Sequence, residues 1–560
     1  MNTNSPTSFT RTQWLICIIA AIGFLFDTYE LLMTPLVAVP AIAELLGLPP
    51  NNPAVTDWTG RMLWMTALCG GTFGLMGGWL IDRFGRKRIM AASIFLYAAS
   101  PFAAAFSTSL PMFIFFRCAT FVGVCVEFVA AITWLAELFP DKRRKGLVLG
   151  WTQAFASLGG LLVTGMNVWI VANATTLPEV LGGHSSWRYL LMTGILPAIP
   201  IALLLPFVPE SQVWREKRAA GEMKRPSFGA LFSPELRRTT LMAAALSACA
   251  YGAAFGALQL TPLRVAPGLP ELKETQAQLQ PLVAEAKKLN GDLNILLNLD
   301  RTEPRPTFSE LVAETPGLPE VVAQRAKNRV AFRSANKAAD TAKIATLGEA
   351  FKSLGAQLDN LTASKPAVKT TILEREKILK ALGDNRALQD PFDKKVKERG
   401  NTAQLYQELG GLVGRVLLAI LLLTAIPRGR LLRLFILPGI VVLPLAYTTF
   451  FTGGGAMFDW GIFVVGLCVV AQFSYFGEYL PKVFPMHLRG TGGSFATNVG
   501  GRMIGTSAAF LTTNVVAYWF DAAPKFQHIA LAAAVVGTTV FVIGFILSFL
   551  LPQPEVEAHD

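Results

Sequence analysis

Ionisable residues inside long apolar segments are the first sign of chemistry in this sequence. Asp27 and Glu30 lie three residues apart in one such segment, so on a helix they share a face. Arg117 and Glu127 lie in a second segment, and Arg502 lies in a third. Charges in apolar surroundings are costly and usually mark a path for ions or polar ligands. An acid beside a guanidinium can exchange a proton for an anion, because protonating the acid frees the guanidinium.

Depth favours one particular pair. If each segment is a membrane-spanning helix, Asp27 and Arg117 both lie roughly 20 Å from the inner face. Equal depth predicts that they form a switch for a proton and an anion, and a permanent structural ion pair is the alternative. Glu127, near mid-membrane, is either a proton carrier or a packing residue bonded to a hydroxyl. Arg502, the only deep cation expected in the second half, either holds a carboxylate or sugar acid or pairs with an acid such as Glu478.

Uncharged polar residues in the apolar segments extend this set. Each could line a pore or only bond a neighbouring helix, and both alternatives stay open. The expected proton-coupling residues are Asp27, Glu30 and Glu127. The expected substrate-binding residues are Arg117, Gln153, Tyr251, Gln472, Asn498 and Arg502.

The elements that must position these residues are membrane spans. The 560 residues are 52% hydrophobic and 16% charged, whereas soluble proteins carry about 25% charged residues. The charges are uneven, since residues 263–408 hold 42 of the 88 charged side chains. The sequence therefore predicts an all-α membrane protein with one soluble insert.

Twelve apolar runs are long enough to cross a bilayer, which takes about 20 residues. The runs are 14–38, 59–81, 88–107, 110–137, 146–172, 188–208, 239–262, 409–426, 434–452, 459–480, 491–519 and 527–551. They predict an N-terminal six-helix half (1–208), followed by a central loop (209–238) and span 7 (239–262). The insert (263–408), spans 8–12 (409–551) and a tail (552–560) complete the chain.

Basic residues predict which side of the membrane each loop faces. The loops at 82–88 and 142–145 are basic, whereas the opposite short loops at 40–58, 173–187 and 453–458 hold no Lys or Arg. We therefore expect a protein of the plasma or inner membrane with both termini in the cytoplasm. The insert would then face outward.

Cysteine, histidine and phosphate-binding patterns exclude several classes. The six cysteines lie in apolar runs, and the four histidines show no metal-ligand spacing. The sequence contains no G-x-x-x-x-G-K-S/T motif, so nothing in it indicates an ATP-driven pump. The basic residues lie beside predicted spans, so the membrane explains the positive net charge and we expect no nucleic-acid partner. We expect no metal, no cofactor and no enzymatic activity.

The loop after the second run carries a motif. Residues 78–87 fill every fixed position of the signature G-x-L-x-D-R-x-G-R-R/K. This loop resembles that of the major facilitator superfamily. A glycine there lets two helices approach, and an acid flanked by basic residues fixes a helix-end contact. An ordinary basic loop with a chance Asp is the alternative.

Three more elements strengthen the resemblance. Glu137–Arg144 and Pro209–Trp214 resemble the E-x6-R and P-E-S-x-x-W elements of the sugar-porter-like branch, and Arg117–Glu137 is similar to a layout in metabolite–proton symporters. The gating residues that the resemblance implies are Gly78, Asp82, Arg83, Gly85, Arg86, Lys87, Glu137 and Arg144.

The resemblance implies a secondary transporter with two six-helix halves that alternate access. Its substrate would be a small polar metabolite, either an organic anion or a sugar-like compound, moved by proton-coupled symport through the lipid bilayer. A non-transporting receptor or scaffold that presents the insert to a partner is the alternative.

The sequence departs from the family pattern in three places. The second-half loop at 428–430 has no Asp, Lys482 stands where Glu137 stands in the first half, and the insert is additional. Leu347, Phe351 and Leu354 recur at helical spacing in the insert. We expect a small helical cap on the outer face, and a solvated, partly disordered linker is the alternative.

Overall fold

The computed structural model describes residues 10–48, 53–139, 142–181, 183–196, 198–220, 226–298, 306–337, 341–424, 426–520 and 527–552. These residues are mostly helical and contain no β-strand beyond one isolated bridge between Val180 and Gly183. The all-α prediction is confirmed for this part of the chain. Contacts divide the chain into two compact units: unit 1 is Met1–Pro50, Ala54–Glu274 and Lys395–Asp560, and unit 2 is Asn51–Pro53 and Thr275–Lys394.

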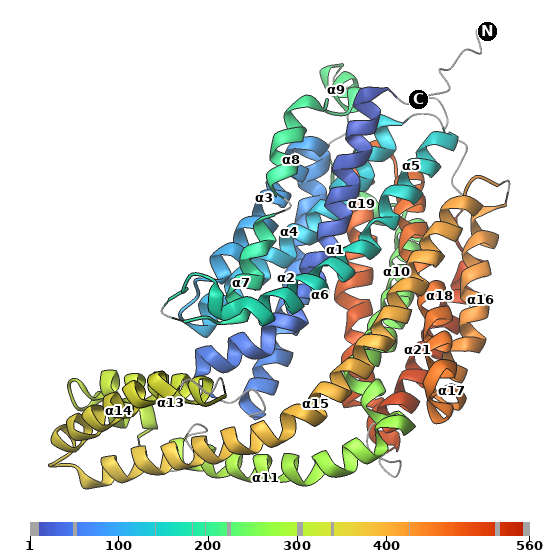
Figure 1. The fold of residues 1–560 in the computed structure, drawn as a ribbon. Coiled ribbons are helices and arrows are strands. Elements are labelled where there is room, and N and C mark those ends of the chain that lie inside the picture. The colour runs from blue at the N-terminus through green and yellow to red at the C-terminus, as the bar shows by residue number, and fades with distance from the viewer. Residues whose placement is uncertain are drawn as a thin grey trace, which may run out of the picture. The chain divides into compact units, whose positions relative to one another are not determined.

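The N-terminal half of unit 1 contains eight helices (Figure 1). They are α1 (Arg11–Leu46), α2 (Pro53–Phe84), α3 (Arg86–Ala104), α4 (Leu110–Leu138), α5 (Lys142–Ala154), α6 (Ala156–Asn173), α7 (Ser186–Met192) and α8 (Ala198–Leu204). Helix α1 begins at a capping box between Thr10 and Gln13 and ends at Gly47, whose φ of 65° suits a glycine C-cap. The helix α9 (Gln212–Ala219) follows in the central loop.

The C-terminal half is built from α10 (Arg237–Gly256), the end of α15 (Pro366–Leu421), α16 (Arg428–Tyr447), α17 (Thr449–Gly453), α18 (Gly455–Val483), α19 (Arg489–Ser494), α20 (Ala508–Asn514) and α21 (Gln527–Ser548). A π-helix, η10 (Phe495–Ile504), joins α19 to α20. Glycines let η10 approach α10, because a Cβ at Gly500 would lie 2.4 Å from the Ala244 carbonyl oxygen.

Within the described ranges, nine helical segments are long and apolar enough to cross a membrane. They coincide with nine of the twelve predicted runs. The other three runs, 88–107, 409–426 and 491–519, are also largely helical. However, α3 begins with three basic residues, most of α15 is polar, and the third run is divided among short helices and η10. The count of twelve spans therefore stays a prediction.

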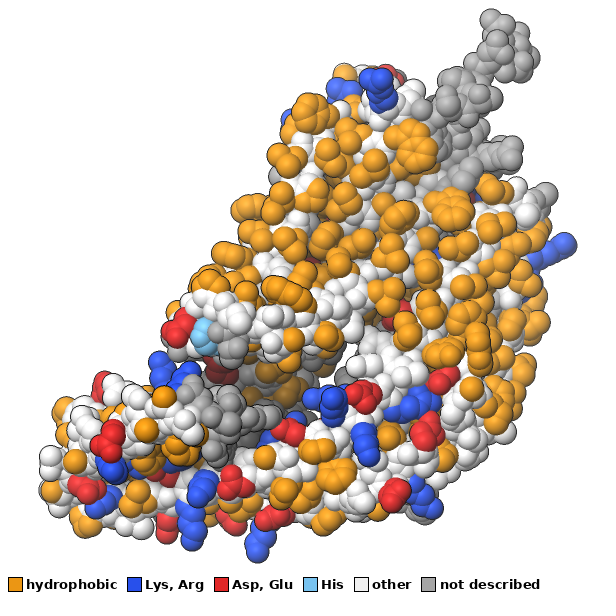
Figure 2. Space-filling view, in the orientation of Figure 1, with side chains coloured by type: hydrophobic (Ala, Val, Ile, Leu, Met, Phe, Trp, Pro, Cys, Tyr) orange, Lys and Arg blue, Asp and Glu red, His pale blue; other side chains and the backbone are white. Residues whose placement is uncertain are grey.

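Hydrophobic side chains cover the visible face of unit 1, as expected for a multi-pass membrane protein (Figure 2). Large apolar residues are exposed on its helices, including Phe115, Trp169 and Phe207, which are 65%, 54% and 74% exposed. Apolar patches of this extent need a membrane or a partner to cover them. Charged side chains are common on the insert in the same view.

Unit 2 contains α11 (Lys273–Leu297), α12 (Phe308–Ala313), α13 (Leu318–Lys337), α14 (Thr341–Leu361) and the first part of α15. Helices α11 and α15 run antiparallel (Figure 1), joined by hydrogen bonds from Asn385 Nδ2 to Glu285 Oε2 at 2.9 Å and from Gln389 Nε2 to the Leu282 carbonyl at 3.2 Å. Polar contacts of this kind, made here by the buried side chains of Asn385 and Gln389, help to fix the register of two helices. The described part of the insert is therefore helical, as predicted, whereas its place outside the membrane stays a prediction.

A charged cluster holds α13 against α15 in unit 2. Arg325 contacts both carboxylate oxygens of Glu376 at 2.7 Å, and Arg329 Nη2 lies 2.7 Å from Glu376 Oε2. Burial pushes the pKa of Glu376 up, but the hydrogen bonds and charges of the two arginines hold it below its usual range.

A second cluster lies in unit 1, where the insert begins and ends. Arg399 of α15 contacts Glu271 Oε1 at 2.7 Å and Asp459 Oδ1 of α18 at 2.8 Å. Gly455 N donates to the same Glu271 oxygen at 3.2 Å. Gly454, at a φ of 63°, faces the other oxygen, and a Cβ there would lie 2.4 Å from it. These contacts tie the chain after α10 and the C-terminal part of α15 to α18.

Candidate functional site

Asp27 and Arg502 form an ion pair between the two halves of unit 1. Asp27 lies in α1 and Arg502 in η10, and Arg502 Nη2 is 3.5 Å from Asp27 Oδ2. Both side chains are buried. Asp27 Oδ1 has no hydrogen-bond partner among the described residues. The predicted pair between Asp27 and Arg117 is therefore wrong in this structure.

Glu30 takes the place beside Arg117 that the sequence assigned to Asp27. Arg117 Nη1 lies 3.9 Å from Glu30 Oε2, and Arg117 Nη2 donates a hydrogen bond to Thr34 Oγ1. Gly194 leaves room for this carboxylate, because a Cβ there would lie 2.4 Å from Glu30 Oε1. This pair lies within the N-terminal half. Two residues three positions apart point about 60° apart around a helix, so the two acids meet different neighbours.

Glu127 of α4 packs against α1 in the same region. A Cβ at Gly23 would lie 2.5 Å from Glu127 Oε1, so this glycine makes room for the carboxylate. Glu127 Oε2 and the Tyr97 hydroxyl are buried without a hydrogen-bond partner among the described residues. Buried polar atoms are normally satisfied, so an orphan oxygen here points to a proton, a water or a ligand.

Arg415 of α15 is a second deep cation of the C-terminal half, and the prediction that Arg502 is the only one is wrong. Arg415 Nη1 donates a hydrogen bond to the carbonyl of Gln153 in the N-terminal half. Its charge also interacts with Asp27 and Tyr251. Arg415 lies inside the apolar run 409–426, so the rule that pointed to Arg502 would have pointed to it.

Glu408 is a further acid that the sequence analysis missed. It lies seven residues before Arg415, at the border between the polar and apolar parts of α15. Its carboxylate faces Gly160 of α6, where a Cβ would lie 3.7 Å away. Glu408 Oε1 also accepts a hydrogen bond from Gln407 Nε2 at 3.2 Å. The border position hid it, because the polar insert ends at this residue.

Gln153 and Tyr251 lie next to these charges. Gln153 is 1% exposed, and its Nε2 has no hydrogen-bond partner among the described residues. The Tyr251 ring packs edge-on against Phe473 with centroids 4.8 Å apart, and its hydroxyl lies within the electrostatic influence of Arg502. Both side chains are therefore placed near groups that can bind a polar ligand.

Asn498 and Gln472 differ in their surroundings. Asn498 Oδ1 accepts from Arg502 Nη1 at 3.3 Å, and Asn498 Nδ2 donates to the Cys125 carbonyl at 3.2 Å, so it joins η10 to α4. Gln472 Nε2 donates to the Cys468 carbonyl of its own helix at 3.0 Å. Asn498 thus helps to hold Arg502, while Gln472 is partly engaged within α18. Within the described ranges, no group of three or more His, Cys, Asp or Glu is placed to hold a metal.

The loop motif closes one end of the interface between the halves. Asp82 Oδ1 accepts from Gly490 N at 3.0 Å, and Asp82 Oδ2 accepts from Thr491 N at 2.7 Å and from Thr491 Oγ1 at 2.8 Å. These donors lie at the start of α19, where a carboxylate is favourable. A Cβ at Gly78 would lie 2.5 Å from the Gly490 carbonyl oxygen, so α2 needs a glycine there.

Arg86 ties this contact to α4. Arg86 Nη2 lies 2.9 Å from Glu137 Oε1 and 3.4 Å from Asp82 Oδ1, and it donates to the Met486 carbonyl at 2.9 Å. Arg489 of the C-terminal half lies 3.7 Å from the same Glu137 oxygen. The side chain of Arg144, the last predicted gating residue, lies outside the described part of the structure.

The remaining motif residues organise the start of α3. Gly85 has a φ of 108°, and Glu210 accepts hydrogen bonds from the backbone N–H groups of Arg86 at 3.2 Å and Lys87 at 3.1 Å. The Arg83 guanidinium lies 4.8 Å from the Trp79 ring centroid. The P-E-S-x-x-W element therefore caps α3.

The second half has its own version of this arrangement. Glu478 of α18 is fully buried and lies 3.1 Å from Arg428 Nη2, and Lys482 contacts the same carboxylate. Glu478 is thus engaged at the end of α18, and the alternative that it pairs with Arg502 is wrong. It stands one helical turn before Lys482, the residue that aligns with Glu137.

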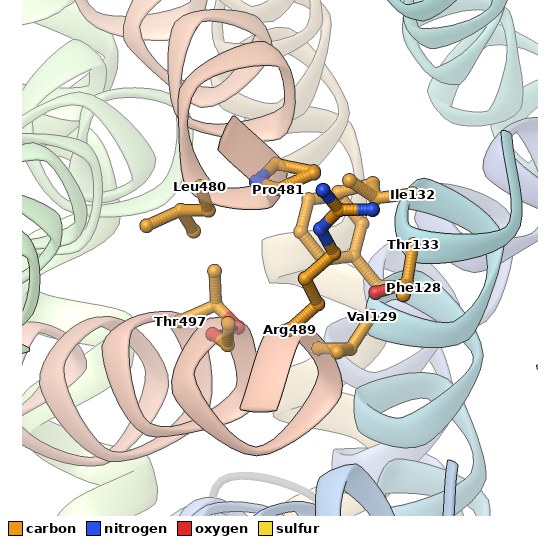
Figure 3. Close-up of a pocket in the computed structure, with 9 residues that line it drawn as sticks. Phe128, Val129, Ile132, Thr133, Leu480, Pro481, Arg489 and Thr497 are labelled. Atoms are coloured by element: carbon orange, nitrogen blue, oxygen red, sulfur yellow. Dashed lines mark hydrogen bonds between the residues drawn. The ribbon is translucent and has the colours of Figure 1, made fainter. Parts of the chain in front are cut away.

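A small niche lies between the halves near this closed end (Figure 3). Phe128, Val129, Ile132 and Thr133 of α4 line one side, and the other residues around it are Leu480, Pro481, Arg489, Gly493 and Thr497. Its cavity volume is about 10 Å³, room for about one water molecule and far below the roughly 300 Å³ or more of a typical ligand site.

Comparison with known sequences agrees with this architecture. The family model for the Major Facilitator Superfamily matches residues 14–280. The cis,cis-muconate transport protein of Acinetobacter baylyi is 29% identical over 180 residues, which cover 31% of this chain and 41% of that protein. The arabinose-proton symporter of Bacillus subtilis is 28% identical over 218 residues, which cover 38% of this chain and 44% of that protein. The chain thus matches less than half the length of these relatives, which are transport proteins and not enzymes.

A solved structure shows the same fold over nearly the whole chain. The proton:xylose symporter XylE of E. coli, bound to 6-bromo-6-deoxy-D-glucose, aligns with a TM-score of 0.54 and 17% identity, covering 97% of this chain and 96% of that one. Together with the nine apolar helical segments among the described residues, this fold indicates a multi-pass membrane protein. Residues 14–280 match the model of the Major Facilitator Superfamily, and the fold is similar to that of a sugar-porter-like member.

Proposed function

We propose that this protein is a secondary transporter that moves a small polar metabolite by alternating access, coupled to protons in symport. The observation that carries the proposal is the buried Asp27–Arg502 pair, which joins the two halves while Asp82 holds one end of the interface closed. Such a pair must break when the halves separate, so protonation of Asp27 can control the movement. The separation and the rejoining of the two six-helix halves then both depend on Asp27.

The charge balance of the central region supports symport of an anion with a proton. The ionisable groups around Asp27 are Glu30 of α1, Tyr97 of α3, Arg117, Cys125 and Glu127 of α4, Tyr251 of α10, Glu408 and Arg415 of α15 and Arg502 of η10. Four carboxylates face three guanidiniums in this set. An anionic substrate would add negative charge to an already negative region, so proton uptake makes its binding favourable.

An organic anion is the substrate class that we favour over a sugar-like compound. The cis,cis-muconate and arabinose relatives illustrate the two classes. Arg415 and Arg502 both reach the interface from the C-terminal half, and guanidiniums are the preferred groups for binding carboxylates. A neutral sugar does not need two cations.

The proposal includes a membrane topology. We infer twelve spans, cytoplasmic termini in a plasma or inner membrane, and an outward insert, because the basic loops lie on the side of the Asp82 contact. Asp82 is part of the basic loop at 82–88, so the closed end would be the cytoplasmic one. The receptor or scaffold alternative is weaker, because a protein that only presents the insert needs neither this contact nor buried charges.

Uptake into proteoliposomes tests the proposal. Labelled muconate, benzoate, nicotinate, arabinose and xylose are supplied with and without an inward proton gradient. We expect at least one carboxylate to accumulate only with the gradient, and neither sugar to do so. Accumulation of a sugar would overturn the anion assignment, and uptake that ignores the gradient would overturn proton coupling.

A further inference from the structure

The interface between the halves contains two guanidiniums with different tasks. Arg502 has two hydrogen-bond partners, Asp27 at 3.5 Å and Asn498 at 3.3 Å, and its charge also interacts with Tyr251 and Cys125. Replacing these partners by a ligand would cost both hydrogen bonds and leave the Asp27 carboxylate without its cation. Arg502 is therefore better suited to hold Asp27 than to bind a substrate.

Arg415 keeps a free donor in the same region. One of its nitrogens, Nη1, is bonded to the Gln153 carbonyl, but its Nε is buried without a hydrogen-bond partner among the described residues. The Nε2 of Gln153 is likewise buried and without a described partner. Glu408 and Asp27 offset part of the Arg415 charge, but neither of the two donors has a hydrogen-bond acceptor among the described residues. Buried donors of this kind need an acceptor, which a ligand can supply.

The backbone of the N-terminal half is arranged to hold this pair together. Helix α5 ends at Ala154 and α6 begins at Ala156, so Gln153 lies in the last turn of α5. Carbonyls in the last turn of a helix lose their helical partners, which makes the Gln153 carbonyl an acceptor for Arg415. Gly477 of α18 leaves space for the Gln153 amide, because Gln153 Nε2 would be the atom nearest to a Cβ there.

We propose that Arg415 and Gln153 form the carboxylate-binding subsite of this transporter, with Arg415 Nε and Gln153 Nε2 as the donors. The inference rests on the proposed function and refines it, because it separates the residue that binds the anion from Arg502, which holds Asp27. A carboxylate bound there joins Gln153 of the N-terminal half to Arg415 of the C-terminal half. The substrate therefore contributes to closing the interface.

The test measures binding rather than transport, using the full-length protein purified in detergent. Thermal unfolding is followed while benzoate, muconate or nicotinate is titrated, with chloride at matched ionic strength and benzamide as the neutral analogue of benzoate. We expect at least one carboxylate to stabilise the wild type and benzamide not to do so. Arg415→Gln should weaken that binding about 10- to 100-fold, the loss expected for a hydrogen bond to a charged group.

Three variants sharpen this test. Arg415→Lys keeps the charge but loses the fixed fork of donors, so it should also weaken binding, and it serves if Arg415→Gln does not fold. Arg502→Gln should weaken binding less than Arg415→Gln. Arg433→Gln is the matched control, because Arg433 of α16 bonds the Gly429 carbonyl at 2.9 Å, away from this region, and should bind like the wild type.

The inference is overturned if no carboxylate stabilises the wild type more than chloride does. It is also overturned if the Arg415 variants bind like the wild type while Arg502→Gln does not bind. If carboxylates bind through Arg415 but none accumulates under a proton gradient, the subsite stands and the proposed function fails. The two proposals can therefore be separated.

Discussion

Two acid–arginine pairs start from neighbouring residues of α1 and differ in what they connect. Glu30 faces Arg117 within the N-terminal half, at 3.9 Å, whereas Asp27 faces Arg502 in the C-terminal half, at 3.5 Å. If the halves rock against each other, the first pair moves as one body and the second must open and close. Two similar acids therefore have different mechanical roles, and only the second can report the position of the halves.

The largest effect is expected at Asp27. With one proton per substrate anion, each unit of pH gradient drives about a tenfold accumulation, since a factor of ten corresponds to 1.4 kcal/mol. Asp27→Asn should remove this accumulation and leave exchange of substrate across the membrane partly intact. Uptake and counterflow in proteoliposomes measure the two quantities. A variant that still concentrates substrate with the normal pH dependence would contradict the role of the pair between the halves.

Substitution of Glu30 should mainly lower the stability of the protein. Glu30→Gln leaves the Arg117 charge buried without its acid, and breaking such a pair costs about 3–5 kcal/mol. We expect a lower melting temperature in detergent, with accumulation reduced but not abolished. Thermal unfolding and uptake of the same preparation measure both. Complete loss of accumulation at wild-type stability would show that the pair within one half carries the coupling.

A smaller effect is expected at the closed end of the interface. In Asp82→Asn, only one of the two side-chain atoms can accept a hydrogen bond, so the hydrogen bonds from Gly490 and Thr491 cannot all form. The contact therefore loses about 1.5–3 kcal/mol. The closed state then becomes less populated, and transport should fall several-fold while folded protein remains in the membrane. Arg83→Gln is the control, because Arg83 makes no contact with α19 among the described residues. Full activity of Asp82→Asn would mean that the motif only sets topology.

The smallest effect on coupling is expected from the insert. Replacing residues 275–394 by a Gly/Ser linker removes the long segment of unit 2 and keeps the Arg399 cluster with Glu271 and Asp459. We expect a monodisperse transporter with unchanged pH dependence of uptake. As a comparison, replacing residues 268–404 also removes Glu271 and Arg399 and should be less stable. An altered pH profile in the shorter replacement would show that the insert takes part in coupling.

The fold class and the closed end were predictable because short-range patterns encode them. Apolar runs located the helices, and the motif named Asp82 before its partners were known. Its partners were not predictable, because Gly490 and Thr491 supply backbone N–H groups, which carry no sequence signal. The number of spans stays a prediction. Three of the apolar runs are not clear spans, because α3 begins with basic residues, most of α15 is polar, and the helix around η10 is broken.

The central site was only partly predictable. Counting residues gives the depth of a side chain but not its direction around the helix or the half that it faces, so Asp27 was assigned the partner that belongs to Glu30. Arg415 and Glu408 were missed because they lie where a polar insert helix continues into a short apolar run. A search for single charges in every run, including those joined to polar segments, would have found Arg415.

Protonation of Asp27 should control whether the halves separate. This is tested most directly by measuring the distance between spin labels on non-natural residues at Glu216 of α9 and Arg430 of α16, both exposed. The labels are compared at pH 5 and pH 8 in wild type and in Asp27→Asn. We predict that the wild-type distance distribution shifts with pH and that the variant shows one distribution at both pH values. A variant whose distribution shifts as in the wild type would contradict the account.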